Sequence, residues 1–183
     1  MSEQRLMDLR EAPLTWPSAL KPRGGNPPDK ETFGNWWSRN NKRLSNLHPQ
    51  IAEQWIYKHW GYTPYGAIPL DRLVWRIEEW TTEYFLEWVD LIFSSPHGSC
   101  EFDYSVFHAK RFEPGLTMDA TGTWNIPPVV IETPNGVCAD KGRLPNVRYW
   151  LIEGHQRWRC LRGFNAHGEC ALSHKVFVLG LLD

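Results

Sequence analysis

The chain has 183 residues, of which 42% are hydrophobic and 22% charged, and its formal net charge is −1. These values favour one folded globular domain, and the charge excludes a uniformly basic nucleic-acid binder, although a local basic patch stays compatible with it. The four Cys are too irregularly spaced for a disulfide scaffold and no stretch reaches the length of a membrane span, so we expect a soluble, cytoplasmic protein with reduced thiols.

The N-terminal third is dominated by chain breakers and then by a helix. Residues 12–31 contain five Pro and two adjacent Gly, which forbid regular structure there. His48-Pro49 then opens a helix, because Pro suits a first helical turn and because Ile51 and Trp55 lie four residues apart. We therefore predict an N-terminal extension over 1–66, made of a Pro-rich arm and helices.

The remaining residues, 67–183, predict a compact α/β (α+β) core with a mixed sheet and packed helices. A short strand, or the lead-in to one, is expected at 67–73, and three- to four-residue apolar spacing predicts a helix from Thr81 through Phe93. Residues 96–122 are rich in loop signals, and 134–145 form a turn-rich connection. Apolar, β-branched runs predict strands over 126–132, 149–152 and 175–179.

The strand at 149–152 leads into the most informative feature of the chain, a Gly-centred cationic turn. Gly154 follows the strand, and from Trp158 the apolar residues recur three apart, as on one face of a helix. Glycine lets a backbone approach a ligand closely, and the first amides of a helix point outward unsatisfied. Together with Arg157 and Arg159, these donors predict an anion site that is best matched to phosphate.

Three segments in this order resemble the ParB/sulfiredoxin superfamily: Ile68-Pro-Leu-Asp-Arg-Leu, Pro127-Pro-Val-Val-Ile, and the strand–turn–helix at 149–161. The resemblance covers 67–179 and implies a nucleotide-binding core of that fold over 67–183. In the family, a Gly-x-x-Arg turn binds nucleotide phosphate. The nucleotide-binding residues implied here are Gly154, Gln156, Arg157, Arg159 and Arg76, the last resembling an arginine that contacts nucleotide in sulfiredoxins.

Two departures from the family narrow the expected function. His155 stands where sulfiredoxins carry their catalytic Cys, so we do not expect reduction of a sulfinic acid. Partition proteins need a DNA-reading helix-turn-helix after this core, and with the sequence ending at Asp183 we do not expect a partition function. The closer resemblance is to plasmid fertility-inhibition proteins of the oncogenic-suppression (Osa) type. That branch implies ATP hydrolysis and DNA cleavage, and a block on DNA transfer through a conjugation or type IV secretion apparatus.

For a triphosphate at the turn, we assign roles to three catalytic residues. Arg157 neutralises charge on the phosphoryl group, His155 donates to a phosphate oxygen or acts as an acid, and Glu153 orients a water or Mg²⁺ bound with the nucleotide. Arg157→Ala is expected to remove most turnover while leaving the fold intact.

Alternative roles for these residues stay open. The same turn can serve a non-catalytic nucleotide or DNA binder, and the arginines expected to follow a nucleic-acid backbone are Arg143, Arg148 and Arg162. Trp36-Trp37, with basic neighbours, can instead be an exposed surface that docks on a partner protein, such as a coupling component of the transfer apparatus. Cys160, His167, Cys170 and His174 could hold zinc, although their spacing matches no standard zinc pattern.

Overall fold

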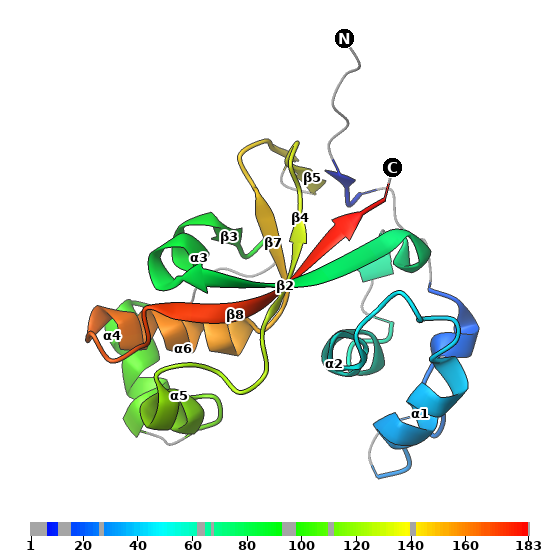
Figure 1. Ribbon diagram of the computed structural model, residues 1–183, viewed down its shortest axis with the longest axis horizontal. Coiled ribbons are helices and arrows are strands. Elements are labelled where there is room, and N and C mark those ends of the chain that lie inside the picture. The colour runs from blue at the N-terminus through cyan, green and yellow to red at the C-terminus, as the bar shows by residue number, and fades with distance from the viewer. Residues whose placement is uncertain are drawn as a thin grey trace. The chain divides into compact units, whose positions relative to one another are not determined.

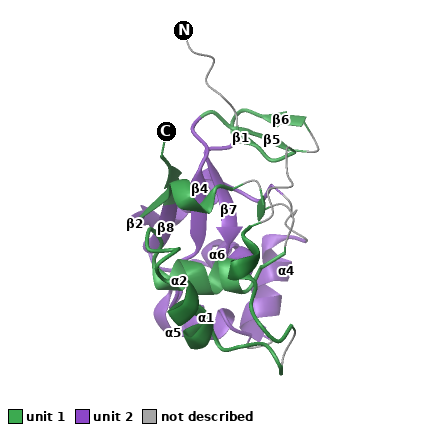
Figure 2. Ribbon diagram, turned by 90° about the vertical axis from the view of Figure 1, so that its right-hand side faces the viewer, with its two compact units in different colours: residues 1–75, 135–146, 179–183 green, residues 76–134, 147–178 purple. Residues whose placement is uncertain are grey.

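The computed structural model describes residues 7–10, 16–25, 28–61, 65–66, 68–92, 98–109, 112–139 and 142–182. It has the predicted mixture of helices and mixed sheets, which makes it an α+β protein (Figure 1). The chain divides into two compact units, shown in Figure 2. Unit 1 comprises Met1–Trp75, Asn135–Asn146 and Leu179–Asp183, and unit 2 comprises Arg76–Pro134 and Val147–Val178. The predicted boundary between residues 66 and 67 does not coincide with this division.

Unit 1 contains short helices and a small sheet. Its three-stranded sheet has the order β1-β5-β6, in which β1 runs parallel to β5 and β5 antiparallel to β6. The predicted turn-rich connection at 134–145 is therefore a hairpin. The elements of unit 1 are β1 (Met7–Asp8), the 3₁₀ helices η1 (Ser18–Leu20) and η4 (Leu70–Arg72), α1 (Phe33–Asn40), α2 (Pro49–Ile51), the π-helix η2 (Ala52–Tyr57), β5 (Val137–Ala139) and β6 (Gly142–Leu144).

The helix predicted from His48-Pro49 is confirmed. His48 is its N-cap and its Nδ1 accepts a hydrogen bond from the Gln50 amide at 3.2 Å, while Pro49 occupies the first turn. The helix continues as η2, and both Ile51 and Trp55 are fully buried. The exposed surface expected at Trp36 is wrong, because this side chain is fully buried and its Nε1 donates to the Leu20 carbonyl at 2.7 Å.

Unit 2 is built on a five-stranded sheet of order β2-β8-β4-β7-β3, of which only Leu73–Trp75 and Leu179–Leu181 count with unit 1. Strand β3 runs parallel to β7 and β4 antiparallel to it. The elements are β2 (Leu73–Thr81), α3 (Thr82–Trp88), β3 (Val89–Asp90), α4 (Cys100–Tyr104), the π-helix η5 (Ser105–Ala109), α5 (Gly115–Thr121), β4 (Val129–Glu132), β7 (Tyr149–Glu153), α6 (His155–Ala166) and β8 (Ser173–Leu181).

Several boundaries differ from the sequence prediction. Residues 70–72 form the 3₁₀ helix η4, so the segment before Leu73 is the lead-in to a strand rather than a strand, and Ala67 lies outside the described residues. The following helix, α3, ends at Trp88 because Val89 begins strand β3. The region 96–122, whose sequence is rich in loop signals, contains α4, η5 and α5.

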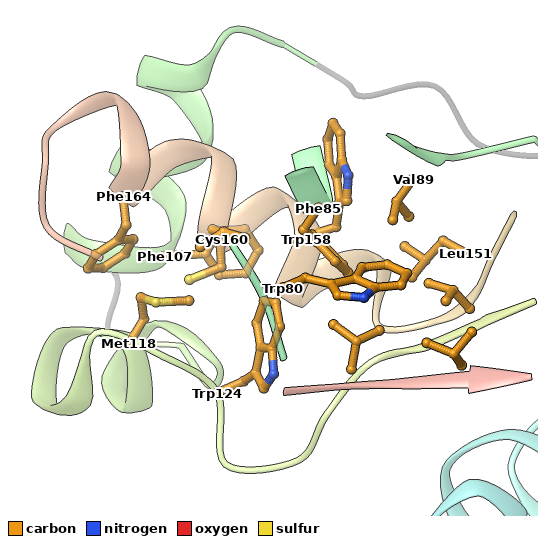
Figure 3. Packing of buried hydrophobic residues seen from close by; sticks show 14 residues of the cluster. Trp80, Phe85, Val89, Phe107, Met118, Trp124, Leu151, Trp158, Cys160 and Phe164 are labelled. Atoms are coloured by element: carbon orange, nitrogen blue, oxygen red, sulfur yellow. The ribbon is translucent and has the colours of Figure 1, made fainter. Parts of the chain in front are cut away.

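The core of unit 2 lies between one face of this sheet and helix α6. Trp158, Leu161 and Phe164 are buried on one side of α6, as their spacing predicts. They belong to the same cluster as four inward-facing strand residues, Val130, Leu151, Val176 and Val178. Figure 3 shows this packing together with Trp80, Phe85 and Trp124. Each such side chain contributes about 1.5–3 kcal/mol on burial, so this cluster fixes α6 on the sheet.

No helix in the described parts of the chain is both long enough and apolar enough to cross a membrane.

Candidate functional site

The predicted strand–Gly–helix turn is present. Strand β7 ends at Glu153, Gly154 adopts a left-handed conformation with φ of +110°, and α6 begins at His155. Gly154 is the N-cap of α6, and this residue has no side chain to cap the helix end. Because the first amides of a helix carry a partial positive charge, the turn is a place where an anion is stabilised.

The space beside Gly154 is filled by the chain itself. A Cβ at this position would lie 2.7 Å from Pro128 Cβ and 3.1 Å from Arg157 Nε. The small size of glycine therefore serves a close approach of the segment before β4 and of the arginine that follows in α6. The sequence predicts that Gly154 lets the backbone approach a ligand closely, whereas the groups that approach it here are Pro128 and Arg157 of the chain itself.

Arg157 is folded back over the turn. Its side chain is 12% exposed, and Nη1 donates to the Ile126 carbonyl at 2.6 Å. Its Nη2 lies 3.6 Å from Oε1 of Glu153, whose side chain is 18% exposed. Burial lowers the pKa of the Arg157 guanidinium, and Glu153 acts in the opposite direction. Arg157 thus fastens the β7–α6 turn to the segment that precedes β4.

Arg159 and Arg162 hold a buried carboxylate on α4. Arg159 donates from Nε and Nη2 to Asp103 Oδ1 at 2.8 and 2.6 Å, and Arg162 Nη2 donates to Asp103 Oδ2. Asp103 is fully buried. Residues two apart on a helix do not face one another, which is why Arg157 and Arg159 do not meet at the turn. Because α6 begins at His155, both arginines lie on this helix and the rule applies to them.

Arg76 lies on β2 and pairs with carboxylates of the sheet. Its Nη1 and Nη2 donate to Glu132 at 3.0 and 2.6 Å, and its Nε donates to Glu78. The hydrogen bonds to Glu132 raise the pKa of Arg76, which stays charged. Arg76 is therefore committed to strand carboxylates, and these hydrogen bonds do not bring it to the 153–159 turn.

The remaining predicted site residues have separate surroundings. His155 is half-buried and Gln156 exposed in the first turn of α6. Arg148 places its guanidinium 4.5 Å from the Trp88 ring, a cation–π contact within unit 2. Arg143 is exposed on β6 of unit 1. Arg162, the third arginine expected to contact DNA, instead donates a hydrogen bond to Asp103.

Metal ligands do not cluster in the described residues, where no group of three or more His, Cys, Asp and Glu could hold an ion. The four residues considered for zinc have different environments. Cys160 is buried in the core, where desolvation raises its pKa to about 12, and His167 Nε2 lies 3.0 Å from Glu101 Oε2. Glu153 is a single carboxylate, which fits Mg²⁺ only when a nucleotide supplies further ligands.

His174 belongs to a buried polar network that the sequence did not reveal. Thr82 Oγ1 donates to the Ala171 carbonyl at 2.8 Å, so it accepts from His174 Nε2 at 2.9 Å. Thr123 Oγ1 lies 2.8 Å from the second ring nitrogen, Nδ1, which therefore accepts. Burial lowers the pKa of His174 to about 4, so this imidazole is neutral at physiological pH.

Comparison of the chain with models of known protein families, with curated proteins and with solved structures found no match.

Proposed function

We propose that this chain is a nucleotide phosphohydrolase of the ParB/sulfiredoxin type, with its phosphate site at the β7–Gly154–α6 turn. The observation that carries this proposal is the turn itself, a strand that ends in a left-handed glycine followed by a 12-residue helix whose N-cap residue offers no capping side chain. Such helix N-termini bind phosphate through backbone amides. Pro128, which belongs to one of the motifs on which the resemblance rests, lies against this glycine.

The residues of the turn divide into two groups. His155 and Gln156 lie in the first turn of α6, where their side chains can reach a bound phosphate. Arg157 must exchange the Ile126 carbonyl for a phosphate oxygen before it can neutralise developing charge. When bound with the nucleotide, Mg²⁺ would supply charge neutralisation, and Glu153 is the side chain that would hold it. Arg159 is assigned to positioning α6 on α4.

In biological terms, the proposal is a plasmid fertility-inhibition factor of the Osa type. It hydrolyses ATP, cleaves DNA and blocks transfer by acting at a conjugation or type IV secretion coupling component. This part rests on the resemblance of the Gly154–Arg159 turn and its flanking motifs.

The proposal is tested by titrating the full chain with ATP and with CTP in Mg²⁺, and by measuring phosphate release and the nicking of supercoiled plasmid. We expect His155→Ala to reduce phosphate release by up to about a hundredfold, since one lost phosphate contact costs about 3 kcal/mol of barrier. Glu101→Gln is a matched control, because Glu101 is an exposed residue of α4 that pairs with His167. Absence of nucleotide binding by the unmodified chain would contradict the proposal.

A second candidate is binding without hydrolysis, and the environment of Arg157 favours it. The guanidinium is already held by the Ile126 carbonyl and by Glu153, so a phosphate has to compete with both. In this case nucleotide raises the unfolding temperature of the chain, while phosphate release stays at the level of a buffer blank. Both results come from the same titration, which separates the two candidates.

A further inference from the structure

Unit 1 contains an open cavity of about 790 Å³ whose walls are rich in cations. One wall is the segment from Ser18 to Gly25, which carries Lys21 and Arg23. The facing wall is the end of α1 with the turn that follows it, which carries Arg39 and Arg43. None of the described lining residues is acidic, and none is aromatic.

Arg39 joins the two walls. Its Nη1 donates to the Ala19 carbonyl at 2.7 Å, its Nη2 lies 3.4 Å from the Lys21 carbonyl, and it also pairs with Glu31. The Glu31 carboxylate in addition accepts from the Arg23 amide at 2.7 Å. Glu31 is therefore used to hold the wall in place, and Arg39 is a positioning residue.

The remaining three cations are available to a ligand. Lys21, Arg23 and Arg43 are exposed, and within the described part of the chain none of their side chains forms an ion pair. Arg39 lies in the last turn of α1 and Arg43 in the turn that follows, and both line the cavity. Three cations around one concave surface, without an acidic neighbour in the described lining, attract an anion with several charges.

The distribution of charge along the chain also favours an anion site in this part of unit 1. Residues 16–61 carry seven Lys and Arg against three Asp and Glu, although the whole chain has a net charge of −1. The segment that forms this cavity is therefore basic within a slightly acidic protein. Such a local excess of positive charge is the electrostatic footprint of a surface that binds nucleic acid.

We propose that this cavity binds the phosphodiester backbone of nucleic acid through Lys21, Arg23 and Arg43. Phosphate contacts of this kind bind without reading sequence, and the described lining has no aromatic side chain on which a base could stack. The site lies wholly within unit 1 and does not depend on the function proposed for the β7–Gly154–α6 turn.

The experiment measures binding of the full chain to a fluorescently labelled DNA duplex by anisotropy, at several salt concentrations between about 50 and 200 mM. Each phosphate neutralised contributes about 0.9 to the slope of log K against log salt concentration. We therefore expect the triple variant Lys21→Ala, Arg23→Ala, Arg43→Ala to lower the slope by about 2.7, equally for unrelated duplex sequences. Arg43→Gln alone should lower it by about 0.9.

Lys42→Ala is the matched control. It removes one exposed cation next to Arg43 in the chain, from a residue that does not line the cavity. We expect it to change the slope by less than half as much as Arg43→Gln. An equal effect of both changes, or an unchanged slope in the triple variant, would overturn the proposal.

Two further measurements distinguish backbone binding from a general loss of folding and from a site for free polyphosphate. The triple variant should keep its unfolding temperature and its nucleotide binding, because the altered side chains have no ion-pair partner in the described residues and lie outside the turn. Inorganic triphosphate should compete with the duplex only weakly. Tight binding of triphosphate to the unmodified chain that the triple variant loses, without duplex binding, would overturn the nucleic-acid assignment.

Discussion

Both the backbone conformation of Gly154 and its lack of a side chain contribute to the stability of the folded chain. Its φ of +110° is a conformation that other residues rarely adopt, and a Cβ would lie 2.7 Å from Pro128. We expect Gly154→Ala to lower the free energy of unfolding by about 2–3 kcal/mol, from backbone strain and the clash together. Urea denaturation measures this difference.

Gly25→Ala is the control for the backbone part of that effect. Gly25 also has a positive φ, of +74°, but a Cβ there would meet no described atom within 4 Å. The two variants should therefore differ in stability by the cost of the Pro128 contact. Equal losses at both positions would show that the close approach at Gly154 has no energetic weight.

Arg157 has a structural role that changes what its substitution is expected to do. The sequence alone predicts loss of turnover with an intact fold. Since the guanidinium is largely buried and donates to the Ile126 carbonyl, Arg157→Ala should also lower the free energy of unfolding by about 1.5–3 kcal/mol. Arg157→Lys should recover only part of this, because an ammonium lacks the planar set of donors.

Chemical denaturation of the two variants, with the nucleotide assays repeated at a temperature where both are folded, checks this prediction. Unchanged stability of Arg157→Ala would show that the contacts with Ile126 and Glu153 contribute little. The assays would then report on nucleotide chemistry alone.

At the scale of elements, helices α4 and α6 are joined by an ionic clamp. Figure 1 shows the two helices side by side, and Asp103 of α4 accepts from Arg159 and Arg162 of α6. Asp103→Asn leaves two largely buried arginines without a counter-charge, so we expect a loss of about 3 kcal/mol in the free energy of unfolding. The matched variant Glu101→Gln affects an exposed pair with His167 and should cost less than about 1 kcal/mol.

Thermal unfolding of both variants gives the comparison. A stability of Asp103→Asn equal to that of Glu101→Gln would mean that apolar contacts alone fix α4 on α6.

His174 connects β8 to the first residue of α3 and to Thr123, and it makes this connection sensitive to pH. The folded protein keeps the imidazole neutral down to a pKa of about 4, whereas in the unfolded chain it takes up a proton near its ordinary pKa of 6.5. The unfolded state thus binds more protons between these values, and stability falls as the pH is lowered from about 6.5 to 4. The loss from this group reaches about 3 kcal/mol.

Urea denaturation at several values between about pH 7 and pH 4 measures this dependence, and His174→Gln should flatten it over the same range. A variant with the slope of the unmodified chain would assign the pH dependence to different groups.

The sequence predicts those elements whose signals are local. His48-Pro49 marks a helix start, and the spacing of Trp158, Leu161 and Phe164 marks the buried face of α6. Strand β2 has no such signal because its burial follows no regular alternation, with Val74, Trp75 and Ile77 all exposed. The short helices between 98 and 121 lie in a region with loop-forming residues, where packing against α6 overrides local preference.

The candidate site is likewise predictable from the sequence only in part. The strand–Gly–helix turn follows from chain order, and it is present. The partners of its arginines do not follow from chain order, because Asp103 is 56 residues from Arg159, and Ile126 offers only a backbone carbonyl to Arg157. A carbonyl partner has no signal in a sequence, since every residue carries one.

At the scale of the whole molecule, unit 1 is assembled from three separate stretches of chain. Its strand β1 depends on β5, since the Met7 amide donates to the Gly136 carbonyl at 3.1 Å and the Leu9 amide to the Cys138 carbonyl at 2.8 Å. We therefore expect a fragment of residues 1–75 to lack cooperative unfolding and amide protection in hydrogen exchange, whereas the full chain shows both. Native-like protection in the fragment would contradict this view of unit 1.

The amide of Leu182 donates to the Arg72 carbonyl at 2.9 Å, and Arg72 in turn donates to the Leu182 carbonyl. These partners are 110 residues apart. Both residues belong to unit 1, so the packing of this unit is complete only when the chain as far as Leu182 has folded back onto the segment before β2.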